Sequence, residues 1–348
     1  MSNQTDRVKY INDITKRHFS PTFCFAKWYH TTIYLQTGET HSCYHPAPHK
    51  IDIDELLTNP SALHNTQHKK QERKEMLEGK QCAGCQYCWN VENMGDDYIS
   101  DRHIRSGSIY NEDRLKEVKF NKWDFNVNPE YIEISFGNEC NFRCGYCHPK
   151  ASSRYYNEIR QHGPYSQSKN HRCDIDWFRI YEEDSNPYLR AWWKWWPEVS
   201  KTLNILRITG GEPTMQKSMY RMFDELEKDP KPHLELNVNS NFGGKEKQLE
   251  KFTDSVNSLL TQNKIKSFKL FTSLDTWNER AEYIRDGLDL KVFERNFDYF
   301  MRNTTAPVTY MITFSLFSVT TFQTLLEKIL EQRRMYNDVN SGRWQRIH

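Results

Sequence analysis

Hydrophobic and polar positions alternate with two different periods along the C-terminal two thirds of the chain. Short apolar runs typical of buried strands alternate with segments whose apolar residues recur at helical spacing. Five strands are predicted, over Tyr131–Phe136, Leu203–Thr209, Leu234–Val238, Ser267–Phe271 and Val308–Phe314. Helices are predicted after them, over Lys217–Leu226, Lys245–Leu260, Leu290–Arg302 and Thr320–Arg333. Strands separated by helices favour parallel pairing with right-handed crossovers.

The N-terminal third has a different pattern. A strand-like run, Tyr29–Leu35, meets a turn at Gly38, and a second short strand that carries Cys43 completes a predicted hairpin. Short helices are predicted over Asp54–Leu57 and His64–Leu77. We therefore expect a small cysteine-rich α+β domain over residues 1–125 and an α/β domain over residues 126–348.

The stretch from Met94 to about Asn126 is polar and without a clear period. It is expected to be a surface connection. The alternative is that some of its polar residues face a site, and the candidates are Arg102, His103, Arg105 and Ser106.

Nine cysteines are present, eight of them in two regions. An odd number in a chain without a secretion signal favours ligands or catalytic groups over a disulfide framework. The first group, Cys140, Cys144 and Cys147, follows a predicted strand with the spacing C-x3-C-x2-C. Closely spaced thiolates suit iron–sulfur clusters or zinc. Structural zinc takes four protein ligands, whereas an iron–sulfur cube held by three thiolates keeps one iron open.

The second group supplies five cysteines for one four-ligand site: Cys24, Cys43, Cys82, Cys85 and Cys88. Structural zinc on four of them is one interpretation. Cys173 stands alone and is interpreted as a free thiol.

Polar and glycine residues follow several predicted strands. Gly210-Gly211-Glu212 comes after the second strand, where glycines let the backbone approach a ligand and a carboxylate accepts from an ammonium group. Later strands end in polar residues, namely Asn239, Asn241, Ser273 and Asp275. At the C-terminal ends of barrel strands, such residues line an active site.

Together, the three-cysteine loop, the Gly-Gly-Glu strand end and the polar tips resemble the signature of the radical S-adenosylmethionine (radical SAM) enzymes. The resemblance implies a [4Fe–4S] cluster on Cys140, Cys144 and Cys147, with SAM at the open iron. It also implies that further residues contact SAM: Tyr146 near the adenine, Gly210, Gly211 and Glu212 at the amino group, Ser273 and Asp275 near the ribose or methionine part, and Asn239 at a strand tip.

The same resemblance implies a partial (β/α) barrel of the TIM type. That fold normally has six strands, and only five are clear in this sequence. Two explanations for the missing sixth strand are a truncated chain and closure of the edge by another chain or segment. An unpaired edge would be a liability for folding.

The spacing Cys24-x13-Gly38-x4-Cys43, with a later C-x2-C pair, is similar to the SPASM and twitch modules that carry auxiliary clusters. This likeness implies a second [4Fe–4S] cluster on Cys24, Cys43, Cys85 and Cys88, with Cys82 able to replace one ligand. Two features depart from the usual pattern: the module precedes the core, and Cys82 is an extra cysteine.

Composition narrows the class of partner. With 48 basic and 46 acidic residues, the net charge of +2 gives no global basic field that would favour a nucleic-acid partner. The N-terminus is polar, and no run of about 18 apolar residues occurs. A soluble, cytoplasmic protein without a membrane partner is expected.

The resemblance implies an enzyme that cleaves SAM reductively to a 5′-deoxyadenosyl radical, which abstracts hydrogen from a substrate. The expected substrate is a peptide or protein side chain, with small metabolites and a nucleoside as alternatives. A reductant such as flavodoxin or ferredoxin is the expected partner. Two other classes compete: a cysteine-rich zinc-binding interaction protein, and a SAM-dependent methyltransferase without radical chemistry.

Overall fold

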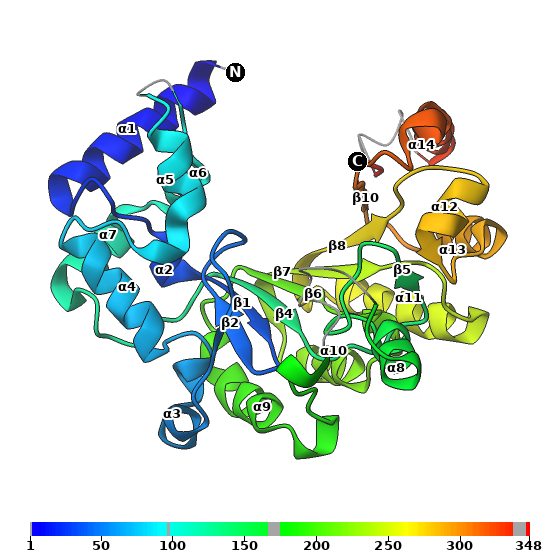
Figure 1. The fold of residues 1–348 in the computed structure, drawn as a ribbon, viewed down its shortest axis with the longest axis horizontal. Helices are drawn as coiled ribbons and strands as arrows, with labels where there is room; N and C mark the ends of the chain where they lie inside the picture. The colour runs from blue at the N-terminus through cyan, green and yellow to red at the C-terminus, as the bar shows by residue number, and fades with distance from the viewer. Residues whose placement is uncertain (1, 96–97, 166–174, 337–345) are drawn as a thin grey trace. The chain divides into compact units, whose positions relative to one another are not determined.

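The structure, a computed structural model, describes residues 2–95, 98–165, 175–336 and 346–348 (Figure 1). The chain forms two compact units that interleave in sequence. Unit 1 contains residues 1–34, 38–133 and 186–203, and unit 2 contains residues 35–37, 134–185 and 204–348. Each unit is described by itself below.

The sheet of unit 2 follows the predicted alternation of strands and helices. Its strands are β4 (Tyr131–Ser135, of which the first three residues belong to unit 1), β6 (Ile205–Thr209), β7 (Lys231–Ser240), β8 (Ile265–Ser273) and β10 (Val308–Met311). They lie in the order β10-β8-β7-β6-β4. β6, β7, β8 and β10 pair in parallel, which confirms the predicted strand direction. The structure is thus a mixed α/β fold, while closure into a barrel stays a prediction.

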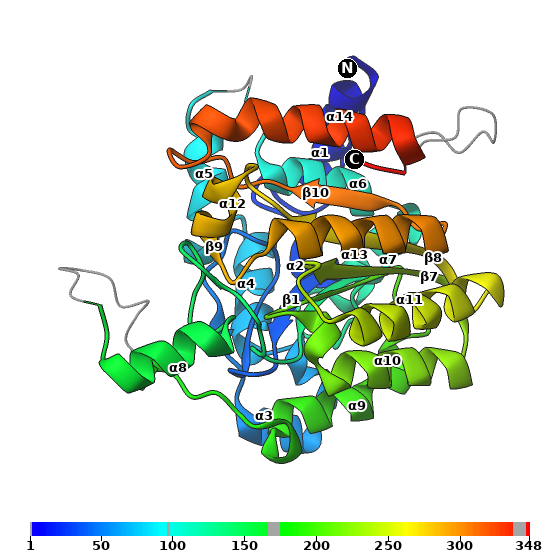
Figure 2. The same cartoon turned by 90° about the vertical axis from the view of Figure 1, so that its right-hand side faces the viewer.

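Helices alternate with the strands of this sheet along the chain. They are α8 (Ser153–His162), α10 (Lys217–Lys228), α11 (Glu246–Thr261), α12 (Glu279–Ile284), α13 (Leu290–Asn303) and α14 (Phe322–Tyr336). Of these, α11 packs against β8. Figure 2 shows α10, α11 and α13 stacked side by side. On α10, apolar residues at helical spacing are buried, namely Met219, Met222, Phe223 and Leu226. This periodicity explains why the helices were predictable from the sequence.

The described part of unit 2 also contains two short strands and four 3-10 turns. They are β5 (Arg143–Cys144), β9 (Arg285–Asp286), η4 (Ile175–Trp177), η5 (Glu183–Ser185), η6 (Pro213–Met215) and η7 (Val319–Thr321). The sequence did not indicate α8, because Ile159 is its one buried residue. Ser152 caps this helix, its hydroxyl accepting from the Tyr155 amide at 3.2 Å. Cys173 lies outside the described residues.

The last described residues, 346–348, pair with the outer edge of β10. The Val308 amide donates to the Arg346 carbonyl at 2.7 Å, and the His348 amide donates to the Val308 carbonyl at 2.9 Å. A parallel bridge joins Val308 to Ile347. A segment of the same chain therefore covers part of the edge that the sequence left without a partner.

Unit 1 is built mainly of short helices around a small antiparallel sheet. Its helices are α1 (Ser2–His18), α2 (Ala26–Tyr29), α3 (Ile53–Thr58), α4 (Gln67–Leu77), α5 (Gln86–Glu92), α6 (Asp101–Ile109), α7 (Glu112–Asn121) and α9 (Pro187–Val199), with 3-10 turns η1 (Pro60–Leu63) and η2 (Ala83–Cys85). Its strands are β1 (His30–Tyr34), β2 (Glu39–His41) and β3 (His49–Lys50). Buried aromatic residues dominate the core, among them Phe23, Phe25, Trp28 and Trp89.

The predicted hairpin is present, with one correction. β1 pairs antiparallel with β2, and Gly38 in the turn has a φ of +66°. Cys43 was expected on the second strand, but β2 ends at His41. The ring of His41 instead forms a hydrogen bond with the Cys43 carbonyl, and the chain leaves the pairing of β1 with β2 after His41.

The polar stretch after Met94 is also different from the prediction, because α6 and α7 occupy most of it. The buried face of α6 includes the polar residues Arg102 and Ser106. A helix that buries polar side chains has no clear hydrophobic period, so the pattern did not reveal it. None of the described helices has the length and apolar character that crossing a membrane requires.

Candidate metal and cofactor sites

In unit 2, Cys140, Cys144 and Cys147 lie on residues 137–147 between β4 and α8, here called the cysteine loop. Its short strand β5 pairs antiparallel with β9, which sets Cys144 opposite Arg285. The Gly145 amide donates to the Ile284 carbonyl at 2.8 Å. On the α8 side, the Ser152 hydroxyl donates to the Phe142 carbonyl at 2.7 Å. Two separate elements therefore hold the loop in place.

The end of β7 holds the loop from a third direction. The Asn241 side-chain Nδ2 donates to the Asn141 Oδ1 at 2.8 Å, and the Asn141 Nδ2 donates in turn to the Gly243 carbonyl at 2.9 Å. A β-carbon on Gly243 would lie 2.4 Å from the ring of Phe142. This close approach requires glycine. Asn241, expected as a strand-tip residue, thus contacts the loop itself.

The Gly-Gly-Glu turn packs directly on the start of the cysteine loop. The Gly211 amide donates to the Gly137 carbonyl at 3.2 Å, and the Glu212 amide donates to the Glu139 carbonyl at 2.6 Å. A β-carbon on Gly211 would lie 2.1 Å from that Glu139 oxygen. The adjacent glycines therefore allow two backbone segments to meet.

The Glu212 carboxylate is 1% exposed and accepts several hydrogen bonds. Thr214 and Ser240 donate their hydroxyls to Oε1 at 2.6 and 2.8 Å, and the Asn241 amide donates to Oε2 at 2.7 Å. Burial nevertheless raises the pKa of Glu212 above its ordinary value. A cationic ligand beside Oε2 would stabilise the ionised form.

A cavity of about 160 Å³ brings most of the expected residues together, and we call it the loop cavity. Its lining includes Cys140, Cys144, Cys147, Tyr146, Gly210, Gly211, Glu212, Asn239, Asn241 and Ser273. Asp275 is not among its lining residues. Its carboxylate instead accepts from the Tyr146 hydroxyl at 2.6 Å, the Arg285 Nε at 3.0 Å and the Thr313 amide at 2.9 Å.

Arg285 lines the loop cavity and was not singled out from the sequence. Its side chain is 7% exposed, and its Nη1 lies 3.6 Å from the Cys144 sulfur. Its guanidinium also stands over the Tyr146 ring, 5.6 Å from the centroid. A single arginine has no spacing or period that would mark it in the sequence. Its strand pairing with Cys144 is what places it beside the loop.

The thiols of the loop favour the protonated form without a metal. Burial raises the pKa of Cys140 to about 12 and that of Cys144 to about 11, although Arg285 opposes the shift at Cys144. A buried thiolate requires a positive partner, which a metal centre supplies. Three soft donors on one cavity wall therefore fit an iron–sulfur cluster.

In unit 1, a cavity of about 10 Å³ is lined by four cysteines, and we call it the four-cysteine cavity. They are Cys24 before α2, Cys43 after β2, and Cys85 and Cys88 at the start of and within α5. Cys82 is buried but is not among the lining residues. Its hydrogen bond to Cys85 lowers the pKa of the Cys85 thiol. The hairpin and α5 thus bring together the four cysteines of the expected ligand set.

Positive side chains surround the four-cysteine cavity. Lys27, Arg102 and Arg105 are among its lining residues. The Lys27 ammonium is buried and pairs with Glu72 at 2.5 Å. Cys85 and Glu72 raise the pKa of Lys27, although its burial opposes the shift. Buried cations of this kind would offset the negative charge of a thiolate-bound cluster.

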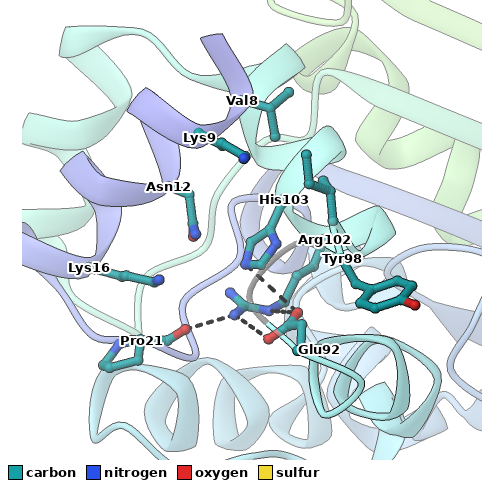
Figure 3. A pocket seen from close by; sticks show the side chains of 11 residues that line it. Val8, Lys9, Asn12, Lys16, Pro21, Glu92, Tyr98, Arg102 and His103 are labelled. Carbon is teal, nitrogen blue, oxygen red and sulfur yellow. Dashed lines mark hydrogen bonds and ion pairs between the residues drawn. The ribbon is translucent and has the colours of Figure 1, made fainter. Parts of the chain in front are cut away.

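Figure 3 shows how Arg102 is positioned at a neighbouring cavity of about 200 Å³. Both oxygens of Glu92 accept from its guanidinium, at 2.6 and 2.7 Å, and Nη2 also donates to the Pro21 carbonyl at 2.8 Å. The Arg102 carbonyl lies 3.9 Å from the Cys24 sulfur. Cys24 thus contacts the backbone of α6 at Arg102, and Glu92 fixes the side chain of that arginine.

The eight described cysteines are free thiols. Within the described ranges, no three or more His, Cys, Asp or Glu side chains are grouped to hold one metal ion. Cysteines of an iron–sulfur cube bind different irons, so their sulfurs surround a wider space than the ligands of a single ion.

Comparisons with known proteins give no family for this chain. No protein-family model and no curated protein sequence matches it. Three crystal structures of SuiB from Streptococcus suis match at low similarity: bound to S-adenosylmethionine (13% identity, TM-score 0.40), bound to the precursor peptide SuiA (12%, 0.39) and SuiB itself (12%, 0.38). The matches cover 86%, 88% and 86% of this chain and 59%, 60% and 58% of the SuiB chains. The chain thus spans less than two thirds of the SuiB length.

Proposed function

We propose that the chain is a radical SAM enzyme whose primary site is the loop cavity. The observation that carries this proposal is the joint placement of three loop cysteines and the Gly-Gly-Glu turn on one cavity wall. Three thiolates leave one iron of a cube without a protein ligand, and the turn offers a carboxylate beside them. Zinc in a structural site would require a fourth protein ligand.

Cys140, Cys144 and Cys147 would hold the [4Fe–4S] cluster, and Glu212 would accept from the SAM amino group. When bound, the cluster and SAM supply one-electron cleavage of SAM and hydrogen abstraction from a substrate. The protein binds and orients these groups. Asn239 and Ser273 would offer polar contacts at the strand ends, and Gly210 and Gly211 would keep the turn close to the loop.

Tyr146 and Arg285 form a second group of positioning residues. Asp275 would act through them, because its carboxylate bonds both the tyrosine hydroxyl and the guanidinium. The aromatic ring, which lines the cavity, would then contact the adenine side of SAM. Arg285 would place positive charge beside the Cys144 thiolate and stabilise it.

For unit 1 we propose a twitch-like domain with a second [4Fe–4S] cluster on Cys24, Cys43, Cys85 and Cys88. Four thiolates give every iron of a cube a protein ligand, and buried cations line the cavity beside them. These features favour electron transfer over direct binding of substrate. We propose flavodoxin or ferredoxin as the reductant, a peptide or protein side chain as the substrate, and the cytoplasm, where thiols stay reduced, as the location.

Anaerobic reconstitution followed by a product assay with dithionite and SAM tests the proposal. We expect a brown protein with absorption near about 400 nm, since iron–sulfur clusters are held by thiolates. The expected products are 5′-deoxyadenosine and methionine. A colourless protein with bound zinc would instead identify the interaction-protein class, and S-adenosylhomocysteine would identify a methyltransferase.

A further inference from the structure

A separate cavity of about 60 Å³ in unit 2 lies along residues 136–139, and we call it the glutamine cavity. Gln36 and Gln216 line it, with exposed fractions of only 2% and 3%. It borders the same loop residues on which the Gly-Gly-Glu turn packs. This position makes its occupant relevant to the proposed active site.

Both glutamines have a buried oxygen without a partner among the described residues. Their orientation is set by their nitrogens: Gln36 Nε2 donates to the Lys150 carbonyl at 3.2 Å, and Gln216 Nε2 donates to the Gly137 carbonyl at 3.1 Å. Each amide oxygen is therefore left over as an acceptor. An unpaired buried acceptor is destabilising, so two of them beside one cavity indicate a missing donor.

The charge of the lining is negative. Glu139, Glu182 and Glu183 line the glutamine cavity, and no lysine or arginine is among its described lining residues. The Glu139 carboxylate folds back over the loop, because a β-carbon on Gly137 would lie 2.2 Å from its Oε2. The lining thus combines neutral acceptors with carboxylates, which suits a cation that donates several hydrogen bonds.

The positive end of helix α10 also lies at this cavity, through Ser218 in its first turn. The N-terminus of α10 already has a carboxylate beside it, because the Ser218 hydroxyl donates to the Glu183 carboxylate at 2.5 Å. Glu139 and Glu182 remain for a ligand. The helix dipole therefore does not oppose a cation there.

We propose that the glutamine cavity binds the ammonium or guanidinium group of a lysine or arginine side chain in the peptide substrate, an inference that rests on the proposed function. Phe136 and Ile180 also line the cavity and provide apolar contact for the methylenes of such a side chain. The Gly137 carbonyl accepts from both Gln216 and Gly211, so two hydrogen bonds through this carbonyl connect Gln216 to the Gly-Gly-Glu turn. The cavity would then anchor the substrate beside the cofactor site.

The test uses the full chain after anaerobic reconstitution and measures binding calorimetrically. The probes are methylguanidinium, n-butylammonium and the neutral isostere methylurea, with KCl and CaCl2 as inorganic cations. We expect saturable binding of the two organic cations and none of methylurea. A lysine-containing peptide should compete with methylguanidinium, whereas its glutamine analogue should not.

Variants locate the binding. Glu139→Gln changes an exposed carboxylate and should weaken methylguanidinium binding about tenfold, as expected for a charged hydrogen bond. Gln36→Leu and Gln216→Leu should weaken it as much or more, and Gln36→Glu should strengthen it. Asn237→Leu is the matched control, because the Asn237 oxygen is also buried and unpartnered in the described part of the chain but does not line this cavity.

Several outcomes would overturn the inference. Equal binding of methylurea, unchanged affinity in Glu139→Gln, or binding of KCl or CaCl2 alone would each exclude an organic-cation site. No binding of any probe would mean that ordered water fills the cavity. SAM cleavage without peptide, measured on the same preparations, reports on the proposed function independently: if cleavage holds and binding fails, only this inference fails.

Discussion

The two cysteine sites of this protein differ in how the chain assembles them. In unit 2, three cysteines come from one loop and line a cavity of about 160 Å³. In unit 1, four cysteines come from three separate segments and line a cavity of about 10 Å³. One arginine lines the loop cavity, whereas Lys27, Arg102 and Arg105 line the four-cysteine cavity.

This difference indicates a division of roles. A site with three thiolates and free volume has room for a ligand at the metal. A site with four thiolates gives every iron of a cube a protein ligand, and its several cations can stabilise the charge of the cluster. Of the two cavities, the loop cavity is therefore the one that fits the proposed reaction site.

The largest expected effect comes from removing one ligand at each site. Cys144→Ala should abolish reductive SAM cleavage and remove about half of the iron, because three thiolates hold the cluster and two do not. Cys85→Ala should also remove about half of the iron but leave SAM binding at the loop cavity intact. Iron analysis, absorption spectra and equilibrium binding of SAM measure these outcomes.

Cys82→Ala is the matched control, since Cys82 is buried next to Cys85 without lining the cavity. It should retain the iron of both sites. If Cys82→Ala lost iron and Cys85→Ala did not, Cys82 rather than Cys85 would be the ligand. Reductive SAM cleavage by Cys144→Ala would contradict the assignment of the primary site.

Next in size is Gly211→Ala, which changes no ligand. Its β-carbon would lie 2.1 Å from the Glu139 carbonyl, so the turn and the loop must separate. We expect a loss of about 1–3 kcal/mol in stability, typical of overpacking, together with strongly reduced SAM cleavage. Thermal unfolding and the product assay measure both.

Gly244→Ala serves as its control. The nearest atom to a β-carbon there is the Gln248 side-chain oxygen at 3.3 Å, which can move. If Gly211→Ala behaved like Gly244→Ala, the close packing of the turn on the loop would not matter for the site.

Arg285→Gln should have an intermediate effect. We expect SAM cleavage to fall about 10–100-fold with iron content unchanged, as is typical when a residue that orients a metal ligand is replaced. Arg143→Gln is the control on the same strand pair, because Arg143 faces Glu158 and Asp286 rather than a cysteine. An equal loss in both variants would indicate a structural role for the β5–β9 pair. The product assay and an EPR-monitored redox titration distinguish a role of Arg285 beside the Cys144 sulfur from a structural role of the strand pair.

Acidification should have the smallest and most gradual effect, which is a loss of stability in unit 1. Burial lowers the pKa of His30 to about 3 and that of His49 to about 2, with Arg105 and Lys69 contributing to the shifts. When the pH falls below 6.5, the ordinary pKa of histidine, the unfolded chain binds protons that these histidines do not bind in the folded chain. Each histidine therefore costs stability as pH falls from 6.5, by up to about 1.4 kcal/mol per pH unit.

Urea midpoints between pH 7 and pH 5 measure this slope. His49→Gln should make the slope shallower, and the exposed His162→Gln in unit 2 should leave it unchanged. An identical slope in all three proteins would show that the buried histidines do not control the acid stability of unit 1.

Much of unit 2 could be predicted because its signals are local. The five strands and the helices α10, α11 and α13 repeat apolar residues with one period each, and burial on one face maintains that period. The loop cysteines lie within eight residues of one another, from Cys140 to Cys147, so their spacing alone indicates a shared site. Helices α6 and α8 were missed because one buries arginine and serine and the other buries little.

The sequence by itself determined the order of the five main strands of unit 2 and of the helices α10, α11, α13 and α14, and which residue types could bind a metal. Only the tertiary structure decided which distant residues meet: Arg285 beside Cys144, Asp275 behind Tyr146, and Cys24 with Cys43, Cys85 and Cys88. The physical reason is that periodicity and spacing act within a few residues along the chain. Pairings of strands such as β5 with β9 depend instead on the packing of the whole unit.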